Sequence, residues 1–344
     1  MKKILVTGSA GFIGFHTCQR LVKENFDIIG LDNLNSYYST DLKYRRLEEL
    51  GIPRKPVNDN DVVGLIKSEQ YNNFRFIRTD TSNRNAIETL FDENPIDVVI
   101  NLAAQAGVRY SLDNPHEYTS SNVEGFLNII EGCRSQNVGH LIYASSSSVY
   151  GANAEIPFHT SATVNSPVSL YAATKIANEL MAHTYAHLYG IPSTGLRFFT
   201  VYGPWGRPDM AYYKFADLMC EGKSIDVYNQ GNMSRDFTYI DDIIESIYRL
   251  ISKPPVTSKE NNLAPHQLFN IGNGSPVNLL KFIEILEDQL GVEAKKNMMP
   301  MQPGDVERTW ADVSELYNYI NYKPQVELEE GIKNFVKWYR SIEI

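Results

Sequence analysis

The sequence predicts an α/β fold: a doubly wound parallel sheet with helices on both faces, followed by a smaller, discontinuous α/β domain toward the C-terminus. Short apolar runs alternate with segments of helical spacing over about the first two hundred residues. This alternation is typical of parallel strands joined by right-handed crossover helices. After Phe199 the rhythm changes, and residues 202–208 are rich in glycine, proline and aromatic side chains. We therefore expect a second domain from Thr200 onward.

The individual elements follow from the spacing of apolar residues. Buried strands are expected at residues 3–7, 26–31, 74–77, 97–102, 140–144 and 193–199. Helices are expected at residues 15–23, 85–93, 122–134 and 171–188, with a further amphipathic helix at 42–51. Loops are expected at residues 55–61 and 253–262, where turn-forming residues gather.

Two later segments, 237–251 and 268–271, are expected to rejoin the sheet layer. The predicted first domain is therefore 1–199, completed by about 237–271. The predicted second domain consists mainly of 200–344.

The composition is that of an ordinary globular protein, with 43% hydrophobic and 21% charged residues and a net charge of −9. The acidic balance argues against non-specific nucleic-acid binding, which needs Lys and Arg to neutralise phosphates. Three scattered cysteines, Cys18, Cys133 and Cys220, predict neither a disulfide framework nor a metal site. No stretch approaches the roughly 20 apolar residues of a membrane span. The opening MKKILVTGSAGFIG is expected to begin a strand rather than a signal peptide, so we expect a protein of the reducing cytoplasm.

Three glycines directly follow the first expected strand and open a helix. Gly8, Gly11 and Gly14 form GSAGFIG. The first glycine permits a tight turn, the second lets the backbone approach a pyrophosphate, and the third lets the helix pack against the sheet. The free N–H groups of the helix N-terminus then face the phosphates. The strand–turn–helix context predicts a dinucleotide site.

An acidic residue follows at the end of the second expected strand. Asp32 stands 18 residues after Gly14. A carboxylate there can accept hydrogen bonds from ribose hydroxyls and repels a 2′-phosphate, so NAD is favoured over NADP. The alternative is a carboxylate that only caps the next turn.

Tyr171 and Lys175 stand four residues apart on an expected helix, and therefore share one face. They follow a strand that delivers a serine cluster to the carboxyl edge of the sheet, where open parallel sheets bind ligands. A free tyrosine has a pKa near 10, too high for a base at neutral pH. We expect the Lys175 ammonium and the nicotinamide ring to lower the pKa of Tyr171. Tyr171 would then act as general base while Ser146 hydrogen-bonds the same sugar oxygen.

The GxxGxxG spacing resembles the extended branch of the short-chain dehydrogenase/reductase superfamily, a Rossmann-type fold. The blocks SSSSVYG, YAATK, RFFTVYGP, RDFTYIDD and PGDVERTWAD resemble nucleotide-sugar epimerases along nearly the whole chain. The resemblance implies a tightly bound NAD and a UDP-sugar substrate. The cofactor residues that it implies are Gly8, Gly11, Phe12, Ile13, Gly14, Asp32, Asn33, Asp80, Thr81, Leu102, Ala103, Ala104, Asn122, Tyr171, Lys175 and Phe199.

The serine cluster distinguishes three reactions within the resembled family. Sugar 4,6-dehydratases carry Asp-Glu before VYG and uronate decarboxylases carry Ser-Glu, whereas this chain has Ser147 and Ser148. Dehydration needs an acid/base pair beyond the tyrosine. Epimerisation needs only oxidation at C4, rotation of the 4-keto sugar and return of the hydride, so epimerisation is favoured.

The substrate prediction depends on the loop after the sixth expected strand. UDP-galactose epimerases typically read RYFN there, but this chain has Thr200 in place of Asn, followed by Arg207 in a block that resembles uronate 4-epimerases. A guanidinium suits a C6 carboxylate. UDP-glucuronate is therefore the leading substrate, and UDP-glucose, UDP-galactose or an N-acetylated sugar is the alternative. Arg207 as an ordinary loop arginine also remains open.

The resemblance also implies where the nucleotide binds. Arg235 would contact phosphate and Asp305 the uridine ribose. Gln302 stands where galactose epimerases often have an arginine, and Arg308 is the candidate to replace that arginine. The resembled family often forms homodimers through two helices, here near 122–134 and 171–188. A catalytically idle NAD-binding regulator on the same fold is the alternative from a different class.

Overall fold

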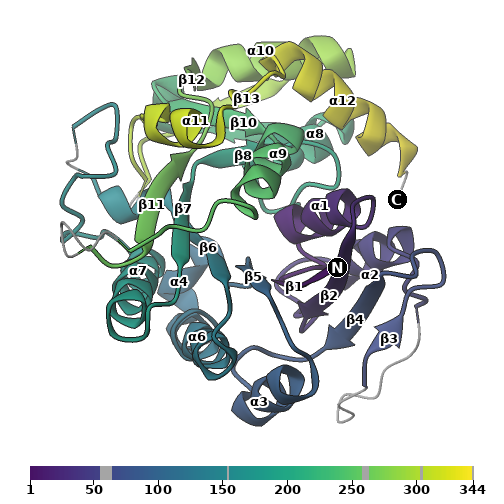
Figure 1. The fold of residues 1–344 in the computed structure, drawn as a ribbon. Helices are drawn as coiled ribbons and strands as arrows, with labels where there is room; N and C mark the ends of the chain where they lie inside the picture. Colours follow the sequence, from purple (N-terminus) through teal and green to yellow (C-terminus); the bar gives the residue numbers. More distant parts are fainter. Residues whose placement is uncertain (55–63, 153–154, 258–262, 303–304, 343–344) are drawn as a thin grey trace.

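The computed structural model describes residues 1–54, 64–152, 155–257, 263–302 and 305–342. Its centre is an eight-stranded sheet of order β11-β7-β6-β5-β1-β2-β4-β3, drawn in Figure 1. The strands are β1 (Lys2–Thr7), β2 (Phe26–Asp32), β3 (Ile66–Lys67), β4 (Phe74–Arg78), β5 (Val98–Asn101), β6 (His140–Ser146), β7 (Ser193–Phe198) and β11 (His266–Ile271). Only β3 runs antiparallel to its neighbour among these described strands. The predicted α/β fold with a large parallel sheet is confirmed.

The apolar runs became strands because their side chains fill both faces of the sheet. All four residues of β5 and all six of β7 are buried, as expected of a parallel sheet covered on both sides. The predicted bounds agree within one or two residues. The largest difference is β6, which continues past Ala144 because Ser145 and Ser146 still pair with β7. This extension carries the serine cluster to the sheet edge.

Helices cover both faces (Figure 1). On one face lie α3 (Arg84–Glu93), α6 (Gly125–Gln136) and α7 (Leu170–Tyr189), and on the other lie α1 (Phe12–Leu21) and α9 (Ile240–Leu250). The helix α2 (Thr40–Glu49) stands where residues 42–51 predicted one. Residues 55–61, expected to be a loop, lie outside the described residues, as do the last five residues of the loop expected at 253–262.

The helix expected from residue 122 begins differently. Two short helices, α4 (Tyr110–Asp113) and α5 (Pro115–Tyr118), lead into a π-helical segment, Thr119–Glu124, before α6 starts. The side-chain amide of Asn122 bonds both backbone groups of Gln105 and the hydroxyl of Thr174. These bonds tie the segment to the end of β5 and to α7.

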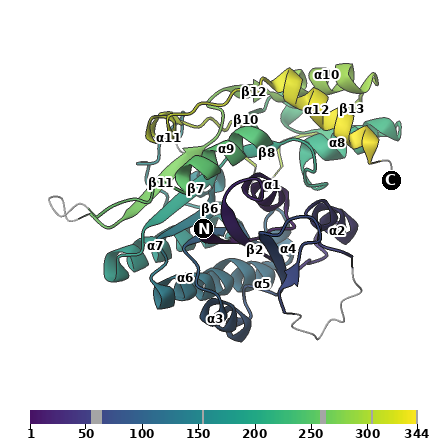
Figure 2. The same cartoon turned by 45° about the vertical axis from the view of Figure 1, so that its right-hand side comes forward.

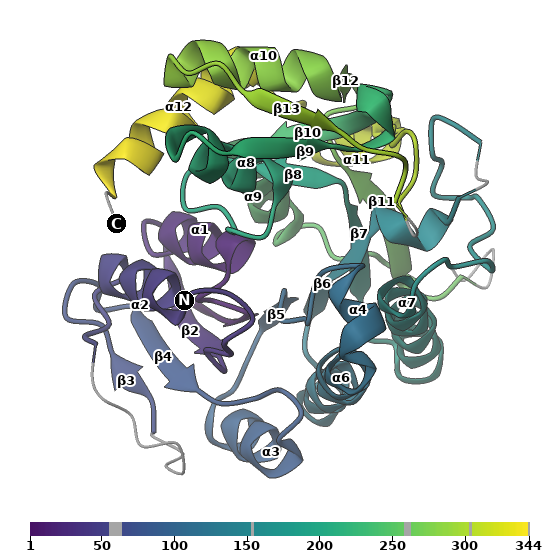
Figure 3. The same ribbon diagram turned by 180° about the vertical axis from the view of Figure 1, so that it is seen from behind.

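The C-terminal elements lie together above the carboxyl edge of the main sheet (Figures 2 and 3). One small sheet has the order β12-β10-β8 and another pairs β13 with β9. Their strands are β8 (Thr200–Tyr202), β9 (Ser224–Val227), β10 (Ser234–Tyr239), β12 (Pro276–Asn278) and β13 (Lys295–Met298). The helices are α8 (Ala211–Cys220), α10 (Leu279–Leu290), α11 (Ser314–Ile320) and α12 (Leu328–Ser341).

Of the two segments expected to rejoin the sheet layer, β11 pairs with β7 in the main sheet. The other begins in β10, which pairs with β8 in the small sheet, and only the following α9 covers the main sheet, by packing on α1. The buried carboxylate of Asp236 in β10 accepts hydrogen bonds from the backbones of Asn273, Gly274 and Ala311, which tie β10 to the segments that follow β11 and β13. None of the described helices combines the length and apolar character needed to cross a bilayer.

Candidate active site

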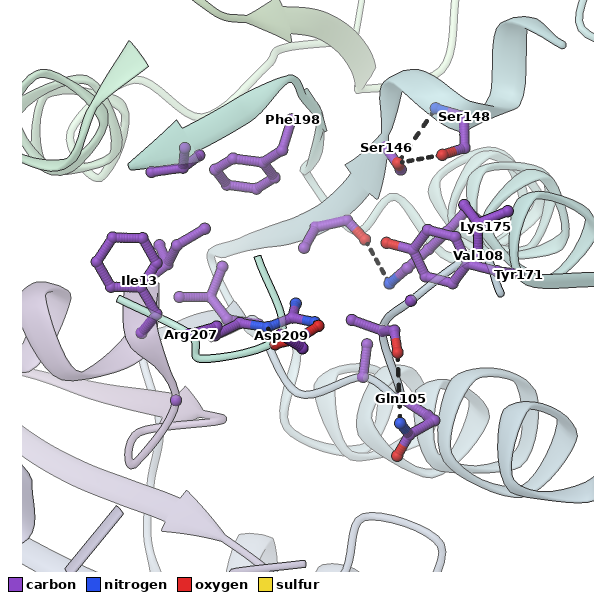
Figure 4. Close-up of a pocket in the computed structure, with 18 of the residues that line it drawn as sticks. Ile13, Gln105, Val108, Ser146, Ser148, Tyr171, Lys175, Phe198, Arg207 and Asp209 are labelled. Carbon is purple, nitrogen blue, oxygen red and sulfur yellow. Dashed lines mark hydrogen bonds and ion pairs between the residues drawn. The ribbon is translucent and has the colours of Figure 1, made fainter. Parts of the chain in front are cut away.

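A cavity of about 600 Å³ opens where the carboxyl ends of the central strands meet the C-terminal elements. Its wall includes the glycine loop after β1, the ends of β2, β5, β6 and β7, and the N-terminal turn of α7. Clefts at the carboxyl edge of a parallel sheet are the usual ligand sites of such folds. Figure 4 shows the part of this cavity around Tyr171 and Lys175.

The glycine loop leaves a cradle that side chains would fill. Gly8 has a φ of +71°, and a Cβ there would lie 2.9 Å from the backbone nitrogen of Ala103. A Cβ on Gly14 would lie 2.0 Å from the Gly8 carbonyl oxygen. The loop can therefore close on α1 only with glycine at both positions. The space and the free N–H groups at the start of α1 fit a dinucleotide pyrophosphate.

Asp32 is buried at the end of β2 and lines the cavity. One carboxylate oxygen accepts from the Ala10 N–H at 3.1 Å, and the other accepts from the Leu34 N–H at 2.8 Å. The carboxylate thus joins the glycine loop to the following turn. Asp32 can cap the turn and also bind a ribose, because each carboxylate oxygen can accept a further hydrogen bond from the cavity side.

The helix α7 presents Tyr171 and Lys175 to the cavity from its first turns. Ser169 caps the helix by accepting a hydrogen bond from the Ala172 N–H, so Tyr171 lies within the positive N-terminal end of the helix. The Lys175 ammonium donates to the Ala144 carbonyl at 3.0 Å and lies 5.9 Å from the centre of the Tyr171 ring. Figure 4 shows the two side chains next to each other, below Ser146 and Ser148.

The electrostatics of this pair differ from the sequence-based expectation. Burial raises the pKa of Tyr171 above its usual value, while the Ser146 hydroxyl and the Arg207 charge lower it. Burial also lowers the pKa of Lys175 to about 8, and Glu179 raises it. In this structure the desolvation of both groups outweighs their favourable neighbours. The Lys175 charge is not among the groups that shift the pKa of Tyr171 here, so acidification of the phenol by Lys175 together with the nicotinamide ring stays a prediction.

A buried ion pair anchors the middle of helix α7 to the main sheet. Glu179 stands one turn beyond Lys175 and forms a bidentate pair with Arg197 of β7, with N–O distances of 2.9 and 2.8 Å. The Ser145 hydroxyl of β6 donates to the same carboxylate at 2.5 Å. Both charged side chains are almost fully buried, at 5% and 2% exposure. The pair therefore ties α7 to two strands of the main sheet.

The serine cluster forms a short 3₁₀ turn after β6. The Ser146 side chain accepts from the Ser148 N–H and donates to the Ser148 hydroxyl, both at 3.2 Å. Ser146, Ser147 and Ser148 all line the cavity. Their hydroxyls supply donors near the Tyr171 phenol without adding a carboxylic acid.

Arg207 lines the cavity opposite Tyr171 but already has a carboxylate partner. Its Nε and Nη2 donate to the two oxygens of Asp209 at 3.0 and 2.5 Å. The Tyr37 hydroxyl donates to the same carboxylate at 3.2 Å. The segment that precedes Arg207 is fixed by Arg46, which is fully buried and donates to the carbonyls of Trp205 and Gly206. Arg207 is thus an ordered cavity residue rather than an exposed loop arginine.

The structure brings most of the predicted site residues to this cavity. Its lining includes Gly8, Gly11, Phe12, Ile13, Gly14, Asp32, Asn33, Thr81, Leu102, Ala103, Ala104, Tyr171, Lys175, Phe199, Ser146, Ser147, Ser148, Thr200, Arg207, Arg235 and Asp305. Three predicted residues lie outside the lining. Asp80 stands behind Asn33, whose amide donates to it at 2.6 Å, and Asn122 braces Gln105 as described above. Arg308 is exposed beside Ser234.

Several residues that line the cavity were not among the predicted site residues, because tertiary contacts bring them there. Tyr37, Lys43, Asp209 and Arg109 line the cavity. The Lys43 ammonium, although buried, donates to the backbone and side-chain oxygens of Asn35 at 2.8 and 2.7 Å. Lys43 lies in a helix that the spacing of apolar residues predicted, but that spacing does not show that the Lys43 side chain faces the cavity.

A parallel sheet with a glycine cradle, and a Tyr–Lys pair beside a serine cluster, define an NAD-dependent enzyme of the short-chain dehydrogenase/reductase type. Residues 4–272 match the model of the NAD dependent epimerase/dehydratase family. The chain therefore belongs to that family, and the prediction of an NAD-dependent nucleotide-sugar epimerase is confirmed.

Three relatives illustrate the similarity. A probable UDP-glucuronate 4-epimerase of Rhizobium meliloti (strain 1021) is 45% identical, with 98% of this chain and 96% of that protein covered. The crystal structure of UDP-glucuronic acid 4-epimerase from Bacillus cereus, in complex with UDP-glucuronic acid and NAD, has a TM-score of 0.85 and 33% identity, covering 99% and 100% of the two chains. UDP-glucose 4-epimerase of Thermotoga maritima with UDP-glucose has a TM-score of 0.83 and 26% identity, covering 99% of each chain.

Proposed function

We propose that this protein interconverts UDP-glucuronate and UDP-galacturonate by inverting C4. The observation that carries the proposal is the composition of the cavity wall, where Tyr171, Lys175 and Ser146 stand opposite a guanidinium and no acidic residue occupies positions 147 and 148. The relatives named for UDP-glucuronate support the same substrate.

NAD is proposed to lie along the glycine cradle, with Asp32 holding the adenosine ribose and Lys175 the nicotinamide ribose. When bound, NAD would supply the hydride acceptor and donor that inversion at C4 requires. The Tyr171 phenolate accepts the proton of the C4 hydroxyl and gives it back after the sugar has rotated. Ser146 donates a hydrogen bond to that oxygen as its charge develops. Burial raises the pKa of Tyr171, and the positive charge of an oxidised nicotinamide bound in this cavity would oppose that effect.

The sugar carboxylate is proposed to bind Arg207, with Thr200 adding a hydrogen bond. Arg207 forms an ion pair with Asp209 in this structure. The substrate carboxylate must therefore either share the guanidinium with Asp209 or take the place of Asp209. Sharing is possible because the five N–H donors of a guanidinium can serve two carboxylates at once. Thr200 begins β8 and lines the same wall.

The direct test is to incubate the NAD-containing enzyme separately with UDP-glucuronate, UDP-galacturonate, UDP-glucose and UDP-N-acetylglucosamine, and to identify the products by chromatography. We expect conversion of the two uronates in both directions. Absence of UDP-galacturonate from the UDP-glucuronate reaction rejects the proposed substrate. Absence of turnover on all four, with NAD still bound, favours an idle NAD-binding protein.

The role of Arg207 is tested by Arg207→Ala, with Arg84→Ala as the matched control because Arg84 pairs with Glu88 on the exposed surface of α3. Removing a charge-assisted hydrogen bond costs about 1.5–3 kcal/mol, or roughly 10- to 150-fold in kcat/KM. We expect that loss on UDP-glucuronate and a much smaller one on UDP-glucose. Equal losses on both sugars discard the carboxylate role.

A neutral-sugar epimerase is the second candidate, and the Arg207–Asp209 pair is the observation that favours it. A guanidinium already neutralised by a protein carboxylate requires no anionic ligand. The same assay separates the candidates, since a neutral-sugar epimerase would convert UDP-glucose with the higher kcat/KM.

We further propose a homodimer formed through α6 and α7. These helices lie side by side, joined by the hydrogen bond from the Tyr185 hydroxyl to Glu131. Their outer surface exposes Leu127, Leu180 and Leu188 at 40%, 64% and 61%. Sedimentation velocity is expected to show a dimer that Leu180→Glu converts to monomer. A wild-type monomer at micromolar concentration rejects the proposal.

A further inference from the structure

A second arginine of the cavity lining, Arg109, joins the two halves of the molecule, and we refer to the part of the lining around Arg109, Arg235 and Asp305 as one end of the cavity. Arg109 immediately precedes α4, in the connection that follows β5 of the main sheet. Its Nη2 lies 2.9 Å from the Asp305 carboxylate, and its guanidinium carbon lies 5.2 Å from the centre of the Tyr228 ring. Asp305 and Tyr228 both belong to the C-terminal elements. The ion pair therefore spans the cavity rather than bracing one wall.

This end of the cavity carries more positive than negative charge. Arg235 also lines it and is held by the carbonyls of Ser234 and Glu307. Burial lowers the pKa of Arg235, the Asp305 charge raises it, and the Arg109 charge lowers it further. Arg109 and Arg235 thus face the single carboxylate of Asp305, which leaves an excess of about one positive charge among these three residues.

A neutral side chain stands close by in the same loop. Gln302 lies three residues before Asp305, and its side-chain oxygen is buried without a hydrogen-bond partner in the structure. An amide in this place supplies no charge to the cavity. The positive charges that line this end of the cavity among the described residues are those of Arg109 and Arg235.

We propose that Arg109 binds the diphosphate of the nucleotide-linked substrate together with Arg235, and that the diphosphate replaces Asp305 as its partner. The planar guanidinium can donate two parallel hydrogen bonds to phosphate oxygens. Asp305, once released, is free to accept hydrogen bonds from the nucleoside ribose. Replacing Asp305 by the diphosphate costs little free energy, because the Arg109 side chain is 52% exposed and partly exposed ion pairs contribute little stability. This inference rests on the proposed function, since it assumes a UDP-linked sugar.

The test compares UDP with uridine, which differ only in the diphosphate, by calorimetric titration and displacement on the NAD-containing enzyme. The variants are Arg109→Ala, Arg109→Lys and the surface control Arg84→Ala. For Arg109→Ala we expect the affinity for UDP to fall about 10- to 30-fold while that for uridine changes less than about threefold, in keeping with the loss of one charge-assisted contact. Arg109→Lys keeps the charge and is expected to recover part of the UDP affinity. Arg84→Ala should match the wild type.

Two results overturn the assignment of Arg109. Unchanged UDP affinity in Arg109→Ala shows that the guanidinium does not touch the diphosphate. An equal loss for UDP and uridine shows that Arg109 acts only by positioning Asp305. Failure of the wild-type enzyme to bind UDP at all refutes the proposed substrate class instead, so the two failures are distinguishable.

Discussion

Replacing Glu179 by Gln is predicted to damage both the stability of the enzyme and its catalytic pH profile. Gln keeps the size of the side chain and removes only the charge. The Arg197 guanidinium, 2% exposed, would then remain charged and buried beside a neutral amide. Breaking one partner of a buried ion pair in this way costs about 3–5 kcal/mol, because the remaining charge is desolvated without compensation.

The expected change in melting temperature follows from the size of the chain. With about 2.1 cal/mol/K of unfolding entropy per residue, 344 residues give an unfolding entropy of about 0.7 kcal/mol/K. A loss of about 3–5 kcal/mol therefore lowers the melting temperature by roughly 4–7 °C in a calorimetric scan. The exposed pair on α3 is the control, and Glu88→Gln is expected to shift it by less than about 1 °C.

A double variant separates the ion pair from ordinary packing. Glu179→Met with Arg197→Met removes both charges and keeps apolar volume, which buried pairs often tolerate. We expect the double variant to be more stable than Glu179→Gln, although Ser145 loses its acceptor. A double variant less stable than the single one would refute the reasoning that an uncompensated charge causes the loss.

The pH profile provides the catalytic measurement. Burial lowers the pKa of Lys175 to about 8, and the Glu179 charge supports it from one helical turn away. Without that charge the pKa falls further, so the ammonium is lost at a lower pH. The alkaline limb of kcat/KM is therefore expected to move to lower pH in Glu179→Gln. An unchanged limb with reduced stability would mean that Glu179 only anchors the helix.

Three further predictions concern the cavity wall. Tyr171→Phe is expected to lower kcat at least about 100-fold, with the NAD content of the purified protein unchanged, because only the general base is lost. Asp32→Ala is expected to weaken NAD binding and permit NADP binding, measured by titration of the stripped protein, since it removes the charge that repels a 2′-phosphate. Arg46→Met leaves the carbonyls of Trp205 and Gly206 unpaired, which should lower stability by about 2–4 kcal/mol and accelerate hydrogen exchange in that loop.

The fold and the catalytic pair could be predicted because they depend on local patterns. Apolar runs fix the strands, and a separation of four residues places Tyr171 and Lys175 on one helical face whatever else surrounds them. Likewise, Gly8 needs its positive φ for a turn that the neighbouring sequence already indicates. These features require no knowledge of distant parts of the chain.

The charge partners could not be predicted, because sequence spacing does not show them. Arg109 and Asp305 are 196 residues apart, and the burial that raises the pKa of Tyr171 is a property of the assembled cavity. The block RDFTYIDD suggested a phosphate contact through Arg235. It also supplies Asp236, whose buried carboxylate holds three backbone N–H groups of the C-terminal elements. The same block can therefore supply a structural anchor next to a residue proposed to bind the ligand.

The exposure of the three ion pairs around this cavity determines which of them a substrate can open. Glu179–Arg197 is almost fully buried, so separating it costs several kcal/mol and the helix carrying Tyr171 stays fixed. Under the proposed function, a ligand anion would replace the carboxylate most easily at Arg109–Asp305, where the arginine is 52% exposed. Arg207–Asp209, with both side chains only 22% and 21% exposed, would cost more to open. In the proposed epimerisation the base must keep its place while the sugar is released from Arg207, turned and held again. A rigid grip on the sugar would stabilise one face and prevent hydride return to the other.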